Sequence, residues 1–132
     1  MGTRCLTFVY DRDVPVINVY RQFDGYPSVH GHELAQFLNS KTLVNGYTNK
    51  NFSEANGMGC LAAQLIVQLK HGVGGIYIYA PVLGCDYGQD YEYHVYEDKV
   101  IVKDSTEVIF EDTWQEFAQF CLDPIEYDRL SK

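Results

Sequence analysis

Residues 58–72, MGCLAAQLIVQLKHG, carry the clearest helix pattern in the chain. Apolar side chains recur in it at offsets of three and four residues, which is the spacing of one face of an α-helix. These side chains are Met58, Leu61, Ala62, Leu65, Ile66 and Leu69. Because Cys60, Ala63 and Val67 make the other side largely apolar too, we expect this helix at the centre of the domain. His71 and Gly72 are typical of a helix end.

Strand patterns lie on both sides of this helix. Alternating β-branched and aromatic residues predict strands at 5–10 and 16–23 before it, and at 75–80, 90–97, 100–103 and 108–110 after it. A short helix is expected at 28–39, a polar loop at 40–55, and a last helix that begins at Thr113 with a capping-box pattern. The order is therefore ββ-αα-ββββ-α. Because short turns join successive strands, we expect an α+β domain with a mostly antiparallel sheet and the helices on one face.

Alternation along the strands also predicts which side chains share a face of the sheet. Ile76 and Ile78 are expected to face the helices, which leaves Tyr77 and Tyr79 on the other side. In the next strand the residues expected on that outer side are Asp90, Glu92, His94 and Tyr96. The sheet should therefore have a polar, tyrosine-bearing outer face, which is a candidate surface for self-association or for a partner protein.

Length and net charge restrict the number of domains and the classes of partner that we expect. The chain has 132 residues and a formal net charge of −8, and all of this excess lies in residues 67–132. We predict one domain over residues 1–124 and a polar tail over 125–132. An acidic chain is a poor partner for duplex nucleic acid and for anionic membranes. No secretory signal pattern opens the chain and the four cysteines form no CxxC pair, so we expect reduced thiols and a cytoplasmic location.

The densest cluster of side chains suited to recognition is residues 20–34, YRQFDGYPSVHGHEL. It holds Arg21, Asp24, Tyr26, His30, His32 and Glu33 at a strand-to-helix junction. Junctions of this kind expose backbone amides, and Arg21 adds a guanidinium for a carboxylate or phosphate. The alternative is a simple turn with solvent-facing histidines. We predict no metal site, because the His-x-His pair lacks a third ligand at a confirming spacing.

A second candidate lies at the start of the central helix. Asn56, Gly57 and Gly59 stand where free amides and the helix dipole attract an anion, and glycines let a ligand approach the backbone. The stretch lacks the ending of a Walker loop and does not follow a strand directly, so it is no recognised phosphate motif. The alternative is that the glycines let the helix pack closely against the sheet.

Cys60 suggests a different chemistry. A thiol in the first turn of a helix has a lowered pKa, and His94 with Glu92 beside it follows on a strand, which is the chain order of papain-like and NlpC/P60-type thiol hydrolases. The predicted faces, however, put His94 on the side of the sheet away from the helices. The alternative is that Cys60 is an inert cysteine that serves as a small buried hydrophobic side chain.

The runs RCLTFVYD, YRQFDGYPSVHGHEL, ANGMGCLAAQL and DYEYHVY resemble a group of small bacterial and phage-borne proteins of no assigned function. This resemblance implies a single small cytosolic domain and supplies no catalytic residue. For a phage-borne protein it suggests the sequestering of a nucleotide signal or the blocking of a host protein.

Three functions remain open at this point. The leading one is a cofactor-free binding module that holds a small polar or phosphate-bearing ligand between the 20–34 segment and the amino end of the central helix. The alternatives are a thiol hydrolase or amidase that uses Cys60 and His94, and an acidic interaction or inhibitor domain that uses the tyrosine-bearing face.

Overall fold

The computed structural model describes residues 2–46 and 53–123. The strands are β1 (Cys5–Asp11), β2 (Val14–Arg21), β3 (Thr42–Val44), β4 (Glu54–Asn56), β5 (Ile76–Tyr79), β6 (Tyr91–Val95), β7 (Val100–Asp104) and β8 (Glu107–Asp112). The helices are α1 (His32–Asn39), which follows a π-helical turn η1 (Pro27–Gly31), α2 (Gly57–Leu69) and α3 (Trp114–Leu122). The predicted α+β class is confirmed. The predicted tail over 125–132 lies outside the described residues.

Six strands form one sheet in the order β5-β2-β1-β6-β7-β8. Every neighbouring pair is antiparallel except β1 and β6, which run parallel in the middle of the sheet. The parallel pair joins the amino-terminal hairpin (β1 and β2) to the carboxy-terminal meander (β6, β7 and β8). Short turns predict the strand pairs within each of these two units but not the pairing between them. The 40–55 segment, expected as a loop, contributes β3 and β4, which pair in parallel as a separate short sheet.

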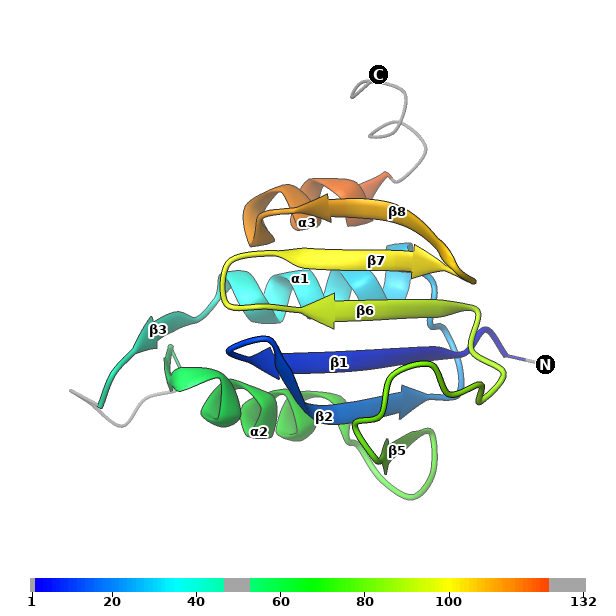
Figure 1. Ribbon diagram of the computed structural model, residues 1–132, viewed down its shortest axis with the longest axis horizontal. Helices are drawn as coiled ribbons and strands as arrows, with labels where there is room; N and C mark the ends of the chain where they lie inside the picture. Colours follow the sequence, from blue (N-terminus) through cyan, green and yellow to red (C-terminus); the bar gives the residue numbers. More distant parts are fainter. Residues whose placement is uncertain (1, 47–52, 124–132) are drawn as a thin grey trace.

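The helices cover one face of the large sheet. Figure 1 shows α1 lying behind β6 and β7 and α3 behind β8, both roughly along the strand direction, while α2 lies along β1 and β2. Side chains from both layers fill the space between them, among them Val9, Val19, Val95, Leu34, Leu61, Leu65 and Phe117. Each fully buried aliphatic side chain of this kind contributes roughly 1.5–3 kcal/mol of transfer free energy.

The central helix is half-buried, which corrects the expectation of a helix enclosed on all sides. Met58, Leu61 and Leu65 are buried as their spacing predicts, whereas the Val67 side chain is 72% exposed. An apolar composition therefore did not decide burial here, because α2 packs one side against β1 and β2 and leaves the Val67 side of the helix exposed.

The outer face of the sheet is less open than its sequence suggests. Leu6, Phe8, Tyr10 and Tyr20 form a second buried cluster there, with Tyr79, Tyr87 and Tyr96 packed against it. The 80–90 connection runs over this face, and its Tyr87 ring packs on Tyr79 with centroids 4.4 Å apart. Tyr79 and Tyr96 therefore lie on the outer face as predicted, but they belong to an aromatic layer that the 80–90 connection partly covers.

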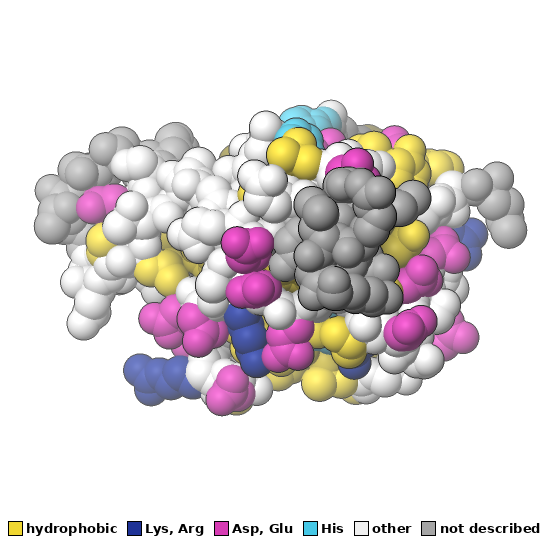
Figure 2. Space-filling model, turned by 90° about the horizontal axis from the view of Figure 1, so that it is seen from above, with side chains coloured by type: hydrophobic (Ala, Val, Ile, Leu, Met, Phe, Trp, Pro, Cys, Tyr) yellow, Lys and Arg dark blue, Asp and Glu magenta, His cyan; other side chains and the backbone are white. Residues whose placement is uncertain are grey.

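The surface around β8 and α3 is acidic. Figure 2, which looks down on this side, shows more Asp and Glu than Lys and Arg side chains. Glu107, Glu111, Asp112 and Glu116 are exposed there. As predicted, α3 begins after Thr113, whose hydroxyl accepts a hydrogen bond from the Glu116 amide at 3.2 Å. In the described part of the chain, no helix has the length and hydropathy that a bilayer crossing requires.

Candidate functional site

The chain turns sharply after β2 and brings Arg21 next to α1. Asp24 adopts a positive φ of 62°, and the His30 amide donates to the Asp24 carbonyl at 3.2 Å. Gly25 packs directly on β1, because a Cβ at this position would lie 2.9 Å from backbone atoms of Arg4 and Cys5. The Tyr93 hydroxyl donates to the Gly25 carbonyl at 2.8 Å and ties the turn to the centre of the sheet.

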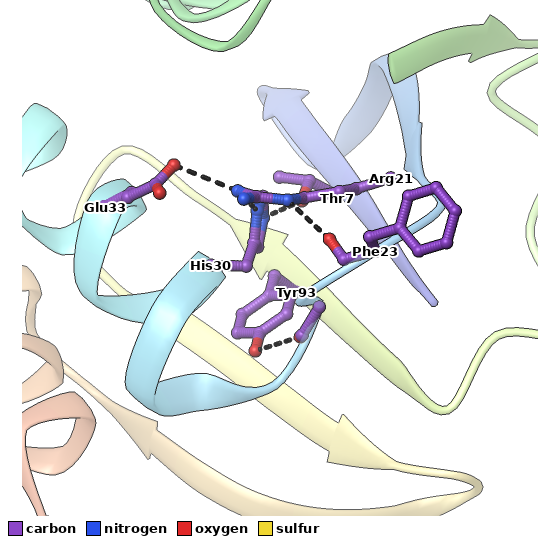
Figure 3. Close-up of polar contacts among 7 residues, drawn as sticks. Thr7, Arg21, Phe23, His30, Glu33 and Tyr93 are labelled. Carbon is purple, nitrogen blue, oxygen red and sulfur yellow. Dashed lines mark hydrogen bonds and ion pairs between the residues drawn. The ribbon is translucent and has the colours of Figure 1, made fainter. Parts of the chain in front are cut away.

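Arg21, the last residue of β2, is held by three protein groups (Figure 3). Its Nε donates to the Phe23 carbonyl at 2.8 Å. Its Nη1 lies 2.9 Å from the Glu33 carboxylate and 3.2 Å from His30 Nδ1. The third nitrogen, Nη2, has no hydrogen-bond partner among the described residues. The guanidinium is therefore fixed in orientation and keeps one donor edge for a ligand.

His30 supports this arginine from behind. A guanidinium only donates, so His30 Nδ1 must accept, and the proton on Nε2 faces the Thr7 hydroxyl at 2.8 Å. The ring is fully buried and tilts over Tyr93. Burial, helped by the Arg21 charge, lowers the pKa of His30 to about 3. His30 is therefore a neutral acceptor at physiological pH and has no free nitrogen for a ligand or a metal.

Arg21 lines a hollow of about 700 Å³. One wall comes from α1 and the residues after it: Glu33, Gln36, Phe37, Ser40 and Lys41. The other comes from the carboxyl end of α2 and the chain that follows: Gln68, Leu69, His71 and residues 72–76. Phe23 and Asp24 complete it at the end of β2. The volume lies within the range of small-molecule and cofactor sites.

The second predicted site does not reach this hollow, which corrects the proposed common pocket. Asn56, Gly57 and Gly59 stand at the opposite end of α2, whose 13 residues span about 20 Å. In Figure 1 that end lies at the left, beside β3, whereas the turn after β2 lies at the right. The Asn56 side chain accepts from the Gly46 amide at 2.8 Å. Arg21 therefore meets the carboxyl end of α2 and not its exposed amides.

The two glycines of α2 do not serve close packing either. A Cβ at Gly57 or Gly59 would meet no atom within 4 Å. Gly57 has a φ of +80°, a conformation that glycine adopts without strain, so it serves the entry into the helix. The alternative that these glycines allow close packing is therefore wrong, whereas the anion cradle stays a prediction.

The six residues predicted in the 20–34 segment divide into three groups. Arg21, Asp24 and Glu33 line the hollow, and His30 lies behind Arg21. Tyr26 and His32 do not line it. Sequence reasoning missed the opposite wall at 68–76, although His71 and Gly72 had been recognised as a helix end. Among the described residues, no three His, Cys, Asp or Glu side chains are grouped so as to hold a metal ion.

Cys60 and His94 lie on opposite faces of the sheet. Cys60 belongs to α2 and packs against the helix-side core. His94 points to the outer face, where its ring stacks on Phe8 with centroids 5.0 Å apart. These two residues therefore cannot form one thiol–imidazole pair in this fold. The predicted neighbour of His94 does contact it, because Glu92 Oε1 lies 2.9 Å from His94 Nε2.

Comparisons with protein-family models, curated proteins and solved structures find no significant match to this chain. The resemblance to small bacterial and phage-borne proteins therefore rests on the quoted sequence runs alone. Any function must be argued from the geometry of the chain's own residues.

Proposed function

We propose that this protein is a binding module for a small ligand that carries a phosphate or carboxylate group. The ligand occupies the hollow between α1, the carboxyl end of α2 and the residues that follow α2. The observation that carries the proposal is the environment of the Arg21 guanidinium. Hydrogen bonds from Nε and Nη1 hold it in place, while Nη2 has no hydrogen-bond partner among the described residues. Its side chain is 16% exposed, so most of it is already out of water.

Pre-organisation favours this role. A flexible arginine loses rotamer freedom when it binds an anion, and this loss weakens binding. Arg21 has already lost that freedom on folding, so the entropy cost of binding is smaller. A charge-assisted hydrogen bond contributes about 1.5–3 kcal/mol. The neighbouring Glu33 carboxylate weakens the attraction for a bare anion. The pair therefore suits a ligand that presents an anionic oxygen to Arg21 and a hydroxyl or amine donor to Glu33.

The remaining walls suit a nucleotide. The Phe23 ring is 53% exposed and borders the hollow, so it offers an aromatic surface on which a base can stack. Gln36 and Gln68 face the same space with amide donors and acceptors. Lys41 adds a second cation at the rim. A nucleoside monophosphate carries all the complementary parts: a phosphate, ribose hydroxyls and a flat base.

Calorimetric titration and thermal denaturation with AMP, GMP and inorganic phosphate test the proposal. At a nucleotide concentration 100 times the Kd, binding stabilises the folded state by about 2.7 kcal/mol, and we expect Tm to rise accordingly. Arg21→Gln should weaken the affinity at least tenfold. Arg12→Gln, which removes an exposed arginine in the β1–β2 turn, should leave it unchanged.

Two results would contradict this function. One is the absence of any stabilisation by millimolar nucleotide or phosphate. The other is equal weakening by Arg21→Gln and Arg12→Gln, which would indicate attraction to general positive charge and no specific site.

A further inference from the structure

The outer face of the sheet holds a hydrogen-bonded chain of four side chains. Gln89 Nε2 donates to Glu92 Oε2 at 3.0 Å, and Glu92 Oε1 lies 2.9 Å from His94 Nε2. The other ring nitrogen, His94 Nδ1, lies 2.6 Å from the Tyr10 hydroxyl. We propose that Tyr10, His94 and Glu92 form a second site, in which the Tyr10 hydroxyl takes the acyl group from a small uncharged ester.

The protons in this chain have defined positions. The hydrogen bond from His94 lowers the pKa of Glu92, so the carboxylate is ionised and His94 Nε2 carries the proton that faces it. In the neutral imidazole this tautomer makes His94 Nδ1 the acceptor, and the Tyr10 hydroxyl donates to it. Burial raises the pKa of Tyr10, so the phenol keeps its own proton in the resting protein. A hydroxyl on a base that a third group orients is the general arrangement of an activated nucleophile.

The chain of side chains opens into a hollow. Tyr10, Glu92 and His94 line a space of about 320 Å³. Its other walls are Leu83, Gly84, Tyr96, Ile101, Lys103, Ser105 and Thr106. The 80–90 connection therefore supplies both a wall, through Leu83 and Gly84, and the Gln89 amide that orients the carboxylate.

The hollow indicates the class of substrate. Leu83, Ile101 and the Tyr96 ring make much of its lining apolar, which suits a short acyl or aryl group. The Glu92 carboxylate and the net charge of −8 disfavour a polyanion such as a phosphodiester chain. Lys103 is the cation among the lining residues that can stabilise a developing oxyanion.

Ester hydrolysis at this site takes two stages, acyl transfer to Tyr10 and release of the acyl group by water. The Tyr10 hydroxyl oxygen attacks the ester carbonyl carbon while its proton passes to His94 Nδ1. The ester C–O bond then breaks, and the leaving oxygen takes the proton from His94. Water attacks the resulting tyrosyl ester and gives one proton to His94 Nδ1, which returns it to the Tyr10 oxygen as the carboxylic acid departs. Glu92 stabilises the imidazolium and does not change its protonation.

Acetylation by 4-nitrophenyl acetate, followed by peptide mass spectrometry, tests the site. We expect Tyr10 to be acetylated at least tenfold faster than Tyr77, which lies on the same face, is 43% exposed and does not line this hollow. Glu92→Gln should slow the acetylation of Tyr10 at least tenfold and leave that of Tyr77 unchanged. Tyr10→Phe keeps the ring that stacks on Tyr96 and should abolish the fast phase of nitrophenolate release.

Two outcomes would overturn the proposal. The first is acetylation of Tyr10 at or below the rate of Tyr77 in the unaltered protein, a comparison that needs no variant to fold. The second is an unchanged Tyr10 rate in a folded Glu92→Gln protein, because a merely structural hydrogen-bond network would give that result.

Discussion

His30 should make the stability of this protein depend on mildly acidic pH. The ring is fully buried and its pKa is lowered from 6.5 to about 3 by burial and by the Arg21 charge. Between these two values the unfolded chain binds a proton at residue 30 and the folded chain does not. Stability is therefore complete above pH 6.5 and falls as the pH is lowered towards 3.

The magnitude follows from the width of this window. Each pH unit below the pKa of the unfolded state costs about 1.4 kcal/mol, so pH 5, which lies 1.5 units below 6.5, costs about 2 kcal/mol. That is a large share of the 5–15 kcal/mol that is typical for a domain.

Urea denaturation at pH 7, 6 and 5 measures this effect. We expect His30→Gln to be less stable than the unaltered protein at pH 7, because it disturbs the contacts to Thr7 and Arg21, but to lose about 2 kcal/mol less on acidification. His71→Gln, which replaces an exposed histidine, should keep the full dependence on pH. Parallel pH profiles for His30→Gln and the unaltered protein would contradict this role of His30, since carboxylate titration is common to both.

Three further predictions concern the stability effects of single substitutions, two at glycines and one at a helix cap. Gly25→Ala should destabilise the protein by about 1–3 kcal/mol in urea denaturation, because the new Cβ would lie 2.9 Å from backbone atoms of Arg4 and Cys5. Gly59 lies within α2 in open space, so Gly59→Ala should instead stabilise the protein by about 0.5–1 kcal/mol. The same substitution should leave the binding of AMP unchanged. Weaker AMP binding would indicate that the ligand site includes the amino end of α2. Thr113→Ala should lower the free energy of unfolding by about 1 kcal/mol, because it removes the hydrogen bond that the Glu116 amide donates to the Thr113 hydroxyl. An unchanged Tm would contradict this prediction.

Most elements of this fold follow from patterns between near neighbours in sequence, but β3 and β4, which pair with each other across the 40–55 segment, do not. Helix spacing identified the buried side of α2, and alternation placed Glu92 and His94 together on one strand face. The Thr113–Glu116 cap was recognisable for the same reason, since its two partners are three residues apart. Such patterns are local because an α-helix repeats every 3.6 residues and a strand every two.

The candidate sites depended on contacts between distant segments. The sequence placed Arg21 and Glu33 in one cluster, but which end of α2 would face them depended on how α2 crosses the sheet. The exposed amides at the amino end of α2 favour an anion, but the fold places the carboxyl end of α2 beside Arg21.

The outer-face site also combines features that local sequence patterns predict with contacts that depend on the tertiary structure. The sequence by itself determined that His94 and Glu92 share a face and that Cys60 lies on a helix. Only the parallel pairing of β1 with β6, which sets Phe8 opposite His94, brought Tyr10 within 2.6 Å of an imidazole 84 residues away. The physical reason is that side-chain period is a property of one strand, whereas the choice of neighbouring strand depends on how the whole sheet buries its apolar surface.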